Sequence, residues 1–439
     1  MRRLGLSLPA VLAVTAVCGC AVGGGDDEQH AAAPSPASKP PPAITTAELE
    51  EHLGALQRIA DRNGGTRAAG TPGYAESADY AAARLKDAGW AVSRQPVPFT
   101  YFQLHKAALT IGGRRLRPAR DFQVYSYSGS GTAAGRLETS GLGCTASDFD
   151  GLDAGEIPLA GRGECFTREK AANAERAGAK ALVVQEDLRS RRGVPSGTLA
   201  VPGIRIPVVV MSTRALGDQG GGSQASVSVE ATSSARTTEN VIAETPGGSG
   251  GRVVMAGGHL DSVRGGPGID DNGSGVATLI ESAEAIGPNP PGAKVRLAFW
   301  AGEELGLLGS RRYVKSLDRS ERDRIAAYLN FDMVGSPNAV PAVYADGDDR
   351  VAKVLRGSTP TRLAAVTAGA ASDHAYFQLA GIPVNGLFTG ASEPGPGGRA
   401  RDPCYHLACD TAMNVNRAVL LAMARTAARA LEQLSRQAK

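Results

Sequence analysis

The sequence lacks two features that would place the protein in a membrane or on a nucleic acid. Beyond its first twenty residues it contains no run of 18 apolar residues, so we expect no membrane-spanning helix in the body of the chain. It also has little net charge, because its 47 Lys and Arg residues are balanced by 44 Asp and Glu residues. A charge of +3, scattered along the chain, is too small to favour a nucleic acid or an anionic membrane as a partner.

The composition itself is that of a folded protein with more than one domain. At about 150 residues per domain, 439 residues are enough for two or three folding units. Hydrophobic residues make up 42% of the chain and charged residues 21%, which is ordinary globular usage and excludes wholesale disorder. The 56 Gly and 26 Pro residues, about a fifth of the chain, favour turns, loops and linkers.

The N-terminal segment has the features of an export signal. The basic start Met1–Arg3 is followed by an apolar run of 14 residues, Leu4–Val17, which is too short to span a membrane. The run ends in a sequence that resembles a bacterial lipobox with Cys20 as the lipidated residue, although Cys18 is unusual there and cleavage by ordinary signal peptidase is the alternative. A Pro/Gly/Ala-rich linker over 21–45 follows. We predict an exported protein, either extracellular or anchored to the outer face of the membrane.

Four further cysteines agree with export. They are Cys144, Cys165, Cys404 and Cys409, and an even number in an exported chain indicates disulfides. Of the three pairings that four cysteines allow, we favour the two local ones. A four-cysteine zinc site is the alternative, but neither pair has the close spacing that structural zinc usually requires.

The body of the chain divides into an α/β part and an insertion. Helices are predicted over 46–62 and from Pro72, where Thr71 is a suitable N-cap. The stretch 105–237 differs, with short extended pieces, Gly-rich turns and one helix over 167–179, and the Ser/Thr-rich residues 232–238 mark its end. No internal repeat is evident.

After Asn240 strands and helices alternate. Strands are predicted at 253–257, 295–300, 326–331 and 384–388, and helices at 274–286, 303–315, 372–380 and 416–437. This pattern predicts an α/β fold with a mixed, mainly parallel central sheet and helices on both faces.

Residues that can bind a metal follow the predicted strands. They are His259, Asp261, Asp271, Glu303, Glu304, Asp332 and His406. Ligands of α/β sheets gather at the carboxyl ends of the strands, and this mixture of imidazole and carboxylate suits zinc better than magnesium or calcium. The carboxylates are too many for one tetrahedral zinc, whereas two zinc ions about 3.5–4 Å apart would use them all. Taken singly, each residue is as well explained as a helix cap, an ion pair or a buried histidine.

The motifs around these residues resemble those of a known family. GGHLDSV, GPGIDDNGSG, FWAGEELGLLGS, YLNFDMVGSPN and DPCYHLACDT are similar to motifs of the co-catalytic di-zinc aminopeptidases, the secreted bacterial leucine aminopeptidases whose wider family includes glutamate carboxypeptidase. The resemblance covers roughly 46–104 and 238–436 and implies their zinc aminopeptidase fold, so we assign 46–104 and 238–439 to one discontinuous peptidase domain. The insertion 105–237, with Cys144 and Cys165, resembles a β-rich α+β protease-associated domain. It carries no arrangement of catalytic residues, so we expect a lid or a substrate-steering module.

The resemblance implies two Zn²⁺ ions per chain and their ligands. One zinc ion would be bound by His259 and Asp332. The other would be bound by Glu304 and His406, and Asp271 would bridge both. In relatives the peptide after the bridging aspartate is cis, so we expect a cis Asp271–Asn272 bond.

The remaining roles implied by the resemblance concern catalysis and the substrate. Asp261 would accept a hydrogen bond from the ring of a ligand histidine, and Glu303 would be the general base for a water between the metals. Tyr405 would stabilise the oxyanion, with simple packing as the alternative. Met333 and Phe388 would form the walls of the pocket for an apolar N-terminal side chain, with core filling as the alternative.

One other histidine, His374, has no counterpart in this set. It lies on an amphipathic segment, and we interpret it as structural. Ala371, three residues before His374, stands where some secreted relatives carry an arginine near the substrate terminus.

The favoured function is therefore a zinc aminopeptidase that removes residues such as leucine from peptide or protein N-termini. A carboxypeptidase or dipeptidase is the alternative on the same fold, but no basic cluster for a C-terminal carboxylate is evident. A glutaminyl cyclase would use one zinc, and a decayed peptide-binding lipoprotein would have lost Glu303 or a ligand. We expect a monomer that contacts a membrane only through an N-terminal lipid anchor and binds no nucleic acid.

Overall fold

The computed structural model describes residues 43–186, 194, 197–217 and 219–438. The predicted export signal, Cys20 and most of the predicted linker lie outside these residues. Within the described part of the chain, none of the helices is both long enough and apolar enough to cross a membrane. Both local disulfides, Cys144–Cys165 and Cys404–Cys409, are present, which confirms the predicted pairing.

A mixed sheet forms the centre of the first and last parts of the described chain. Its four inner strands are parallel and lie in the order β14 (Val384–Phe388), β11 (Ile325–Phe331), β9 (Ser249–His259) and β10 (Ala293–Trp300). The outer strands are β12 (Ala342–Tyr344), antiparallel to β14, β13 (Ala364–Val366), parallel to β12, and β8 (Gln224–Glu244), antiparallel to β10. The predicted mixed, mainly parallel sheet is confirmed.

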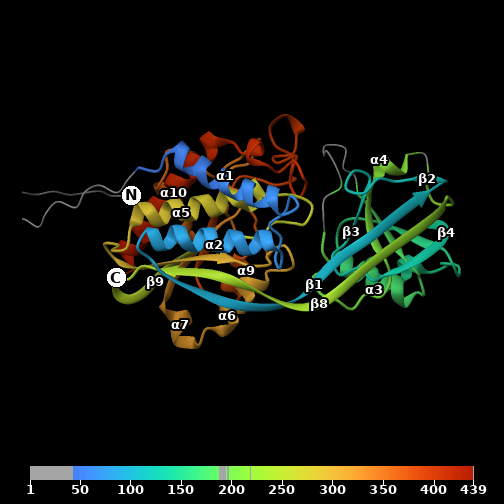
Figure 1. Ribbon diagram of the computed structural model, residues 1–439, viewed down its shortest axis with the longest axis horizontal. Coiled ribbons are helices and arrows are strands. Elements are labelled where there is room, and N and C mark those ends of the chain that lie inside the picture. The colour runs from blue at the N-terminus through green and yellow to red at the C-terminus, as the bar shows by residue number, and fades with distance from the viewer. Residues whose placement is uncertain (1–42, 187–193, 195–196, 218, 439) are drawn as a thin grey trace, which may run out of the picture. The chain divides into compact units, whose positions relative to one another are not determined.

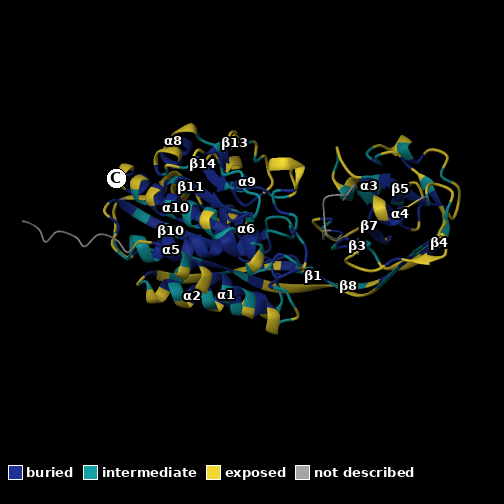
Figure 2. Ribbon diagram, turned by 90° about the horizontal axis from the view of Figure 1, so that it is seen from above, coloured by how far each residue is buried: buried dark blue, intermediate teal, exposed yellow. Residues whose placement is uncertain are grey.

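Helices cover both faces of this sheet (Figure 1). One face carries α1 (Thr46–Arg62), α2 (Pro72–Asp87), α5 (Gly275–Ile286), α8 (Asp349–Gly357) and α10 (Arg417–Gln437). The other face carries α6 (Leu308–Ser316), α7 (Arg319–Arg324) and α9 (His374–Leu379). Alternate side chains of β10 enter the two cores, with Leu297 and Phe299 on the first face and Ala298 and Trp300 on the second. The strands are therefore buried from both sides (Figure 2).

Local sequence signals set the ends of several helices. Thr45 and Glu48 form a capping box at the start of α1, and Thr71 caps α2 with Pro72 in the first turn, as predicted. Asn416 caps α10 by accepting a hydrogen bond from the amide of Val419.

One predicted helix start is wrong. The helix expected from Glu303 begins at Leu308, and residues 303–307 form turns. The backbone has positive φ at Gly302 (+70°), Gly306 (+106°) and Leu307 (+58°), a conformation that no α-helix contains. Glu303 and Glu304 therefore lie on a turn after β10.

The insertion has its own core. Its strands are β3 (Phe122–Val124), β4 (Gly131–Thr139), β5 (Ile157–Gly161), β6 (Leu182–Glu186) and β7 (Val208–Ser212), and its helices are α3 (Thr167–Arg176) and α4 (Thr213–Leu216). Their apolar side chains form a separate buried cluster that includes Leu159, Val183 and Val209. This part is the β-rich α+β unit that the sequence predicts.

The predicted limits of the insertion fall inside two long strands. β1 (Ala91–Ile111), which also pairs with the short β2 (Arg114–Arg115), and β8 pair antiparallel along almost their whole length, from the peptidase part into the insertion (Figure 1). Residues 232–238, expected to mark the end of the insertion, lie within β8. Most of this stretch is exposed, so it shows no hydrophobic alternation, and its backbone groups are satisfied by pairing with β1.

Candidate metal centre

The carboxyl ends of the inner strands bring the predicted residues together. His259 is the last residue of β9, and Asp332 directly follows β11. Asp271 lies in the irregular turn η2 (Ile269–Ser274) that opens α5, and the peptide bond between Asp271 and Asn272 is cis, as expected. His406 lies on a loop after β14, inside the ring closed by Cys404–Cys409.

Two histidine–carboxylate groups share one aspartate. Nε2 of His259 lies 3.1 Å from Oδ1 of Asp271 and 3.3 Å from Oδ1 of Asp332. Nε2 of His406 lies 3.2 Å from Oδ2 of Asp271 and 3.1 Å from Oε2 of Glu304. Because Asp271 offers one oxygen to each histidine, it has the geometry of a bridging ligand between two metal sites.

The unpaired atoms of the cluster fit a cation. The Nδ1–H of His259 donates to the main-chain oxygen of Asp261 (3.0 Å), which leaves Nε2 facing the carboxylate oxygens, where it can offer a lone pair to a metal ion that replaces its proton. Oδ1 of Asp332 and Oε1 of Glu304 are buried and accept no hydrogen bond. Buried carboxylates that face imidazole lone pairs require positive charge between them, and Zn²⁺ uses these donor atoms.

The protein groups alone already attract positive charge at this position. Burial disfavours a charged imidazole, but the carboxylates of Asp332 and Asp271 raise the pKa of His259 well above its usual value. In the same way Glu304 and Asp271 outweigh burial and raise the pKa of His406. The cluster therefore has the negative potential that two metal dications need.

Asp261 accepts the hydrogen bond from the ring of His259 through its main chain rather than through its carboxylate. The ring of His259 is held by the main-chain oxygen of Asp261, whereas its carboxylate Oδ1 lies 3.9 Å from Nδ1. That Oδ1 accepts hydrogen bonds from the amides of Gly302 (2.9 Å) and Glu303 (3.2 Å). Asp261 thus fixes both the histidine and the turn that carries the two glutamates.

A cavity of about 300 Å³ opens beside the cluster, and the predicted catalytic and pocket residues line it. They are Glu303, Met333, Phe388 and Tyr405. Burial and the charge of Glu304 raise the pKa of Glu303 well above its ordinary value, which suits a group that must take up a proton. Ala371 also lines this cavity, as does His374, whose Nε2 lies 2.9 Å from the main-chain oxygen of Gly369.

Sequence reasoning missed two supporting residues. Asp410 accepts hydrogen bonds from the amides of Asp270 (2.8 Å) and Asp271 (3.0 Å), and Ser372 donates to Oδ2 of Asp332 (2.7 Å). Asp410 could have been suspected, because it lies in the same DPCYHLACDT motif as His406.

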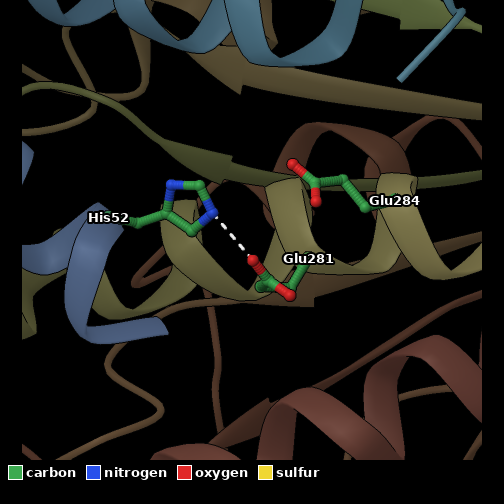
Figure 3. A group of neighbouring side chains, drawn as sticks. All are labelled: His52, Glu281 and Glu284. Carbon is green, nitrogen blue, oxygen red and sulfur yellow. Dashed lines mark hydrogen bonds and ion pairs between the residues drawn. The ribbon is translucent and has the colours of Figure 1, made fainter. Parts of the chain in front are cut away.

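A second histidine–carboxylate group consists of His52, Glu281 and Glu284 (Figure 3). Its members have protein partners. His52 contacts Glu281 (Nε2–Oε1 2.8 Å) and the hydroxyl of Tyr80 (2.6 Å), and Glu284 binds Arg84 (2.6 Å). We interpret this group as a buried link between α1 and α5 rather than as a metal site.

The short disulfide next to His406 leads to a testable expectation. A ring this small constrains the unfolded chain by only about 2 kcal/mol, whereas catalytic groups must be held within about half an ångström. If His406 is a zinc ligand, we expect the double variant Cys404→Ser/Cys409→Ser to lower kcat and to weaken zinc binding at the His406 group more than it lowers the melting temperature. Enzyme kinetics measures kcat, zinc titration measures the zinc affinity, and calorimetry measures the melting temperature. If the variant kept both zinc ions and full kcat and only melted earlier, the bridge would be purely structural.

Comparison with known proteins agrees with this geometry. Residues 240–431 match the model of peptidase family M28, and residues 130–219 match the PA domain. The chain is 37% identical to "Probable lipoprotein aminopeptidase LpqL" of Mycobacterium tuberculosis, over 86% of this chain and 82% of the relative. It is 34% identical to "Probable leucine aminopeptidase 2" of Aspergillus fumigatus, over 82% of this chain and 78% of that relative. A zinc aminopeptidase from Bacillus subtilis has the same fold, with a TM-score of 0.70, 27% identity and coverage of 89% of this chain and 94% of that one.

Proposed function

This chain belongs to peptidase family M28 as a zinc-dependent aminopeptidase with an inserted PA domain, and from this premise we propose that it removes apolar N-terminal residues such as leucine with two zinc ions. The observation that carries the proposal is the sharing of Asp271 between two histidine groups next to Glu303. His259 and Asp332 would hold one ion, and Glu304 and His406 the other. When bound, the ions would polarise the scissile carbonyl and lower the pKa of the attacking water.

Glu303 is assigned as the general base. Among the described residues it belongs to neither histidine group, yet it lines the same cavity as His259 and Asp271. Its carboxylate would take a proton from the attacking water and then deliver it to the departing amine. On the turn after β10 the two neighbours have different surroundings, because Glu304 belongs to the His406 group and Glu303 lines the cavity.

Tyr405 is assigned as the donor to the oxyanion that forms during attack. Its ring stacks on His406, with 3.8 Å between ring centroids, so its orientation is coupled to that of a ligand. Burial and the charge of Asp271 raise its pKa well above the usual value, which keeps the phenol protonated at neutral pH. A protonated phenol can donate a hydrogen bond to a developing negative charge.

The cavity supports an apolar substrate residue. Met333 and Phe388 lie on its wall, and its volume of about 300 Å³ can accept a leucine side chain. The relative from Aspergillus fumigatus is described as a leucine aminopeptidase, which supports the same preference. Ala371 offers no charge at the position where some secreted relatives carry an arginine, so recognition of the substrate terminus falls to other groups.

The insertion is proposed to steer the rest of the peptide. A second cavity, of about 180 Å³, reaches Glu304 and His406. Its wall includes Phe102 and Leu104 of β1 and Val124 of β3 in the insertion. The two cavities share His406, so a peptide whose first residue occupies one of them could continue into the other.

Export is proposed as well. The Mycobacterium tuberculosis relative is described as a lipoprotein, and disulfides are typical of exported proteins. Cys20 would carry the lipid anchor if the lipobox-like end is used, and cleavage without lipid would release the protein.

The sharpest test compares leucyl-p-nitroanilide with its N-acetylated form. We expect the acetylated compound to be hydrolysed at least about 100-fold more slowly, because it lacks the charged amine and its hydrogen bonds. Release of p-nitroaniline measures both rates. Equal rates for the two compounds would contradict an aminopeptidase. Turnover of the free-amine compound, which has no C-terminal carboxylate, would also argue against the carboxypeptidase alternative.

A further inference from the structure

Arg67 has an unusual position for an arginine. It lies in the connection between α1 and α2, and its side chain is completely buried. The guanidinium donates hydrogen bonds to three main-chain oxygens, those of Pro267 (2.9 Å), Gly268 (2.6 Å) and Leu260. Buried arginines are normally paired with carboxylates, so a set of main-chain acceptors from a single loop needs an explanation.

The three acceptors belong to the segment that joins two assigned zinc ligands. Residues 260–268 run from His259 to the turn that carries Asp271 and contain no helix or strand. Arg67 binds this segment at both ends, at Leu260 next to His259 and at Gly268 three residues before Asp271. A rigid planar group thus bridges the two ends of the loop.

Further hydrogen bonds hold the same loop against the connection that carries Arg67. The amide of Arg67 donates to the hydroxyl of Ser262 (2.9 Å), and the amide of Ser262 donates to the main-chain oxygen of Arg67 (3.4 Å). The hydroxyl of Thr66 donates to the main-chain oxygen of Val263 (3.0 Å). At Gly268, where φ is +64°, a Cβ atom would lie 3.3 Å from Nη2 of Arg67 and 2.4 Å from the oxygen of Asp271, so the close approach requires glycine.

The charge of Arg67 suits the acids around it. Burial lowers its pKa to about 10, and the carboxylates of Asp261, Asp410 and Asp271 oppose this decrease. Arg67 is therefore a cation at neutral pH, close to three buried acids but hydrogen-bonded to none of them. Its direct contacts set geometry, and its charge offsets that of the acids.

We propose that Arg67 is a positioning residue. It holds His259 and Asp271 at the spacing required by the zinc ion assigned to His259 and Asp332, before that ion binds. The proposal rests on the function proposed above, in which these two residues are ligands. Arg67 touches neither metal nor substrate, so it acts only through the loop. Outer groups that orient metal ligands typically change metal affinity by 10- to 100-fold when they are replaced.

The test separates the shape of the side chain from its charge. Arg67→Lys keeps the charge but cannot span three acceptors with a planar fork, and Arg67→Met removes both. We expect Arg67→Lys to weaken zinc binding at the His259 site by 10- to 100-fold. Binding at the His406 site should weaken less, because of the two positioned residues only the shared Asp271 would serve that site. Arg62→Lys is the matched control, because Arg62 is exposed and pairs with Glu76 on the surface. Zinc affinity is measured by competition with a chelator, and the melting temperature of the zinc-free proteins is measured alongside.

The outcomes distinguish this inference from the function on which it rests. If the unmodified protein binds two zinc ions and Arg67→Lys melts earlier but binds both as tightly, Arg67 only stabilises the fold and the proposal is overturned. If the unmodified protein does not bind two zinc ions, the two-zinc function itself fails.

Hydrogen exchange on the unmodified protein avoids any dependence on the folding of variants. The amide of Ser262 donates to the main-chain oxygen of Arg67, and the amide of Ile269 donates to the main-chain oxygen of Asp410. In the zinc-free protein we expect both amides to exchange at least tenfold more slowly than unprotected amides. Exchange of both amides at the unprotected rate until zinc is added would show that the metal, not Arg67, orders the loop.

Discussion

Replacing Glu303 by alanine is expected to lower kcat by about 10²- to 10⁴-fold while both zinc ions remain bound. The change removes the group assigned to proton transfer, and among the described residues Glu303 is in neither histidine–carboxylate group. KM should change less than kcat, because the proton is transferred only in the transition state. Steady-state kinetics on leucyl-p-nitroanilide and zinc analysis of the same sample measure the two quantities.

Its neighbour provides the matched comparison. Glu304→Ala should instead lose zinc, because Oε2 of Glu304 lies 3.1 Å from Nε2 of His406 and would contribute a ligand atom. Added zinc should restore part of the activity of Glu304→Ala and none of that of Glu303→Ala. If the two variants lost the same amount of metal and activity, the division of roles between these neighbours would be wrong.

Replacing Asp271 by alanine is expected to abolish activity and to remove tight binding of both zinc ions. Among the described residues, Asp271 is the one that belongs to both groups, with Oδ1 towards His259 and Oδ2 towards His406. Without it each ion would keep one histidine and one carboxylate, too few protein ligands for a catalytic zinc site, which normally has three. The unmodified protein should contain two zinc ions per chain, and a chelator should inactivate it.

Metal analysis at micromolar free zinc is the measurement for Asp271→Ala. Asp79→Ala is a suitable control, because Asp79 is an exposed carboxylate that pairs with Arg94 on the surface. A sample of Asp271→Ala with one zinc ion and undiminished kcat would exclude a co-catalytic pair, as would full activity of the unmodified protein with a single zinc ion.

Much of the fold and of the site follows from local properties of the sequence. Alternation of strands and helices after Asn240 predicts a mainly parallel sheet, because parallel strands need crossover connections that helices provide. Residues at the carboxyl ends of such strands must meet at one edge, so the order of the predicted strands is enough to group His259, Asp332 and Glu304. Helix caps such as Thr71 are likewise determined within a few residues of sequence. The even number of cysteines indicates disulfides, and the local pairing that the sequence favours is the one that the structure contains.

Other features were decided by contacts between distant residues. The exposed Ser/Thr-rich stretch 232–238 is a strand because β1 pairs with it, and its own sequence carries no hydrophobic alternation. The turn at 303–307 depends on glycines with positive φ and on the carboxylate of Asp261, 41 residues away from Gly302.

Arg67 is the clearest case. By sequence it is an ordinary cation in a polar connection, and nothing nearby marks it as buried. Only the packing of the connection between α1 and α2 against the loop between His259 and Asp271, about 200 residues further along the chain, gives it main-chain acceptors and surrounding acids. Sequence patterns report periodicity and local bonding. The burial of a charge depends instead on which distant groups offer hydrogen bonds to it, and those groups come together only when the chain has folded.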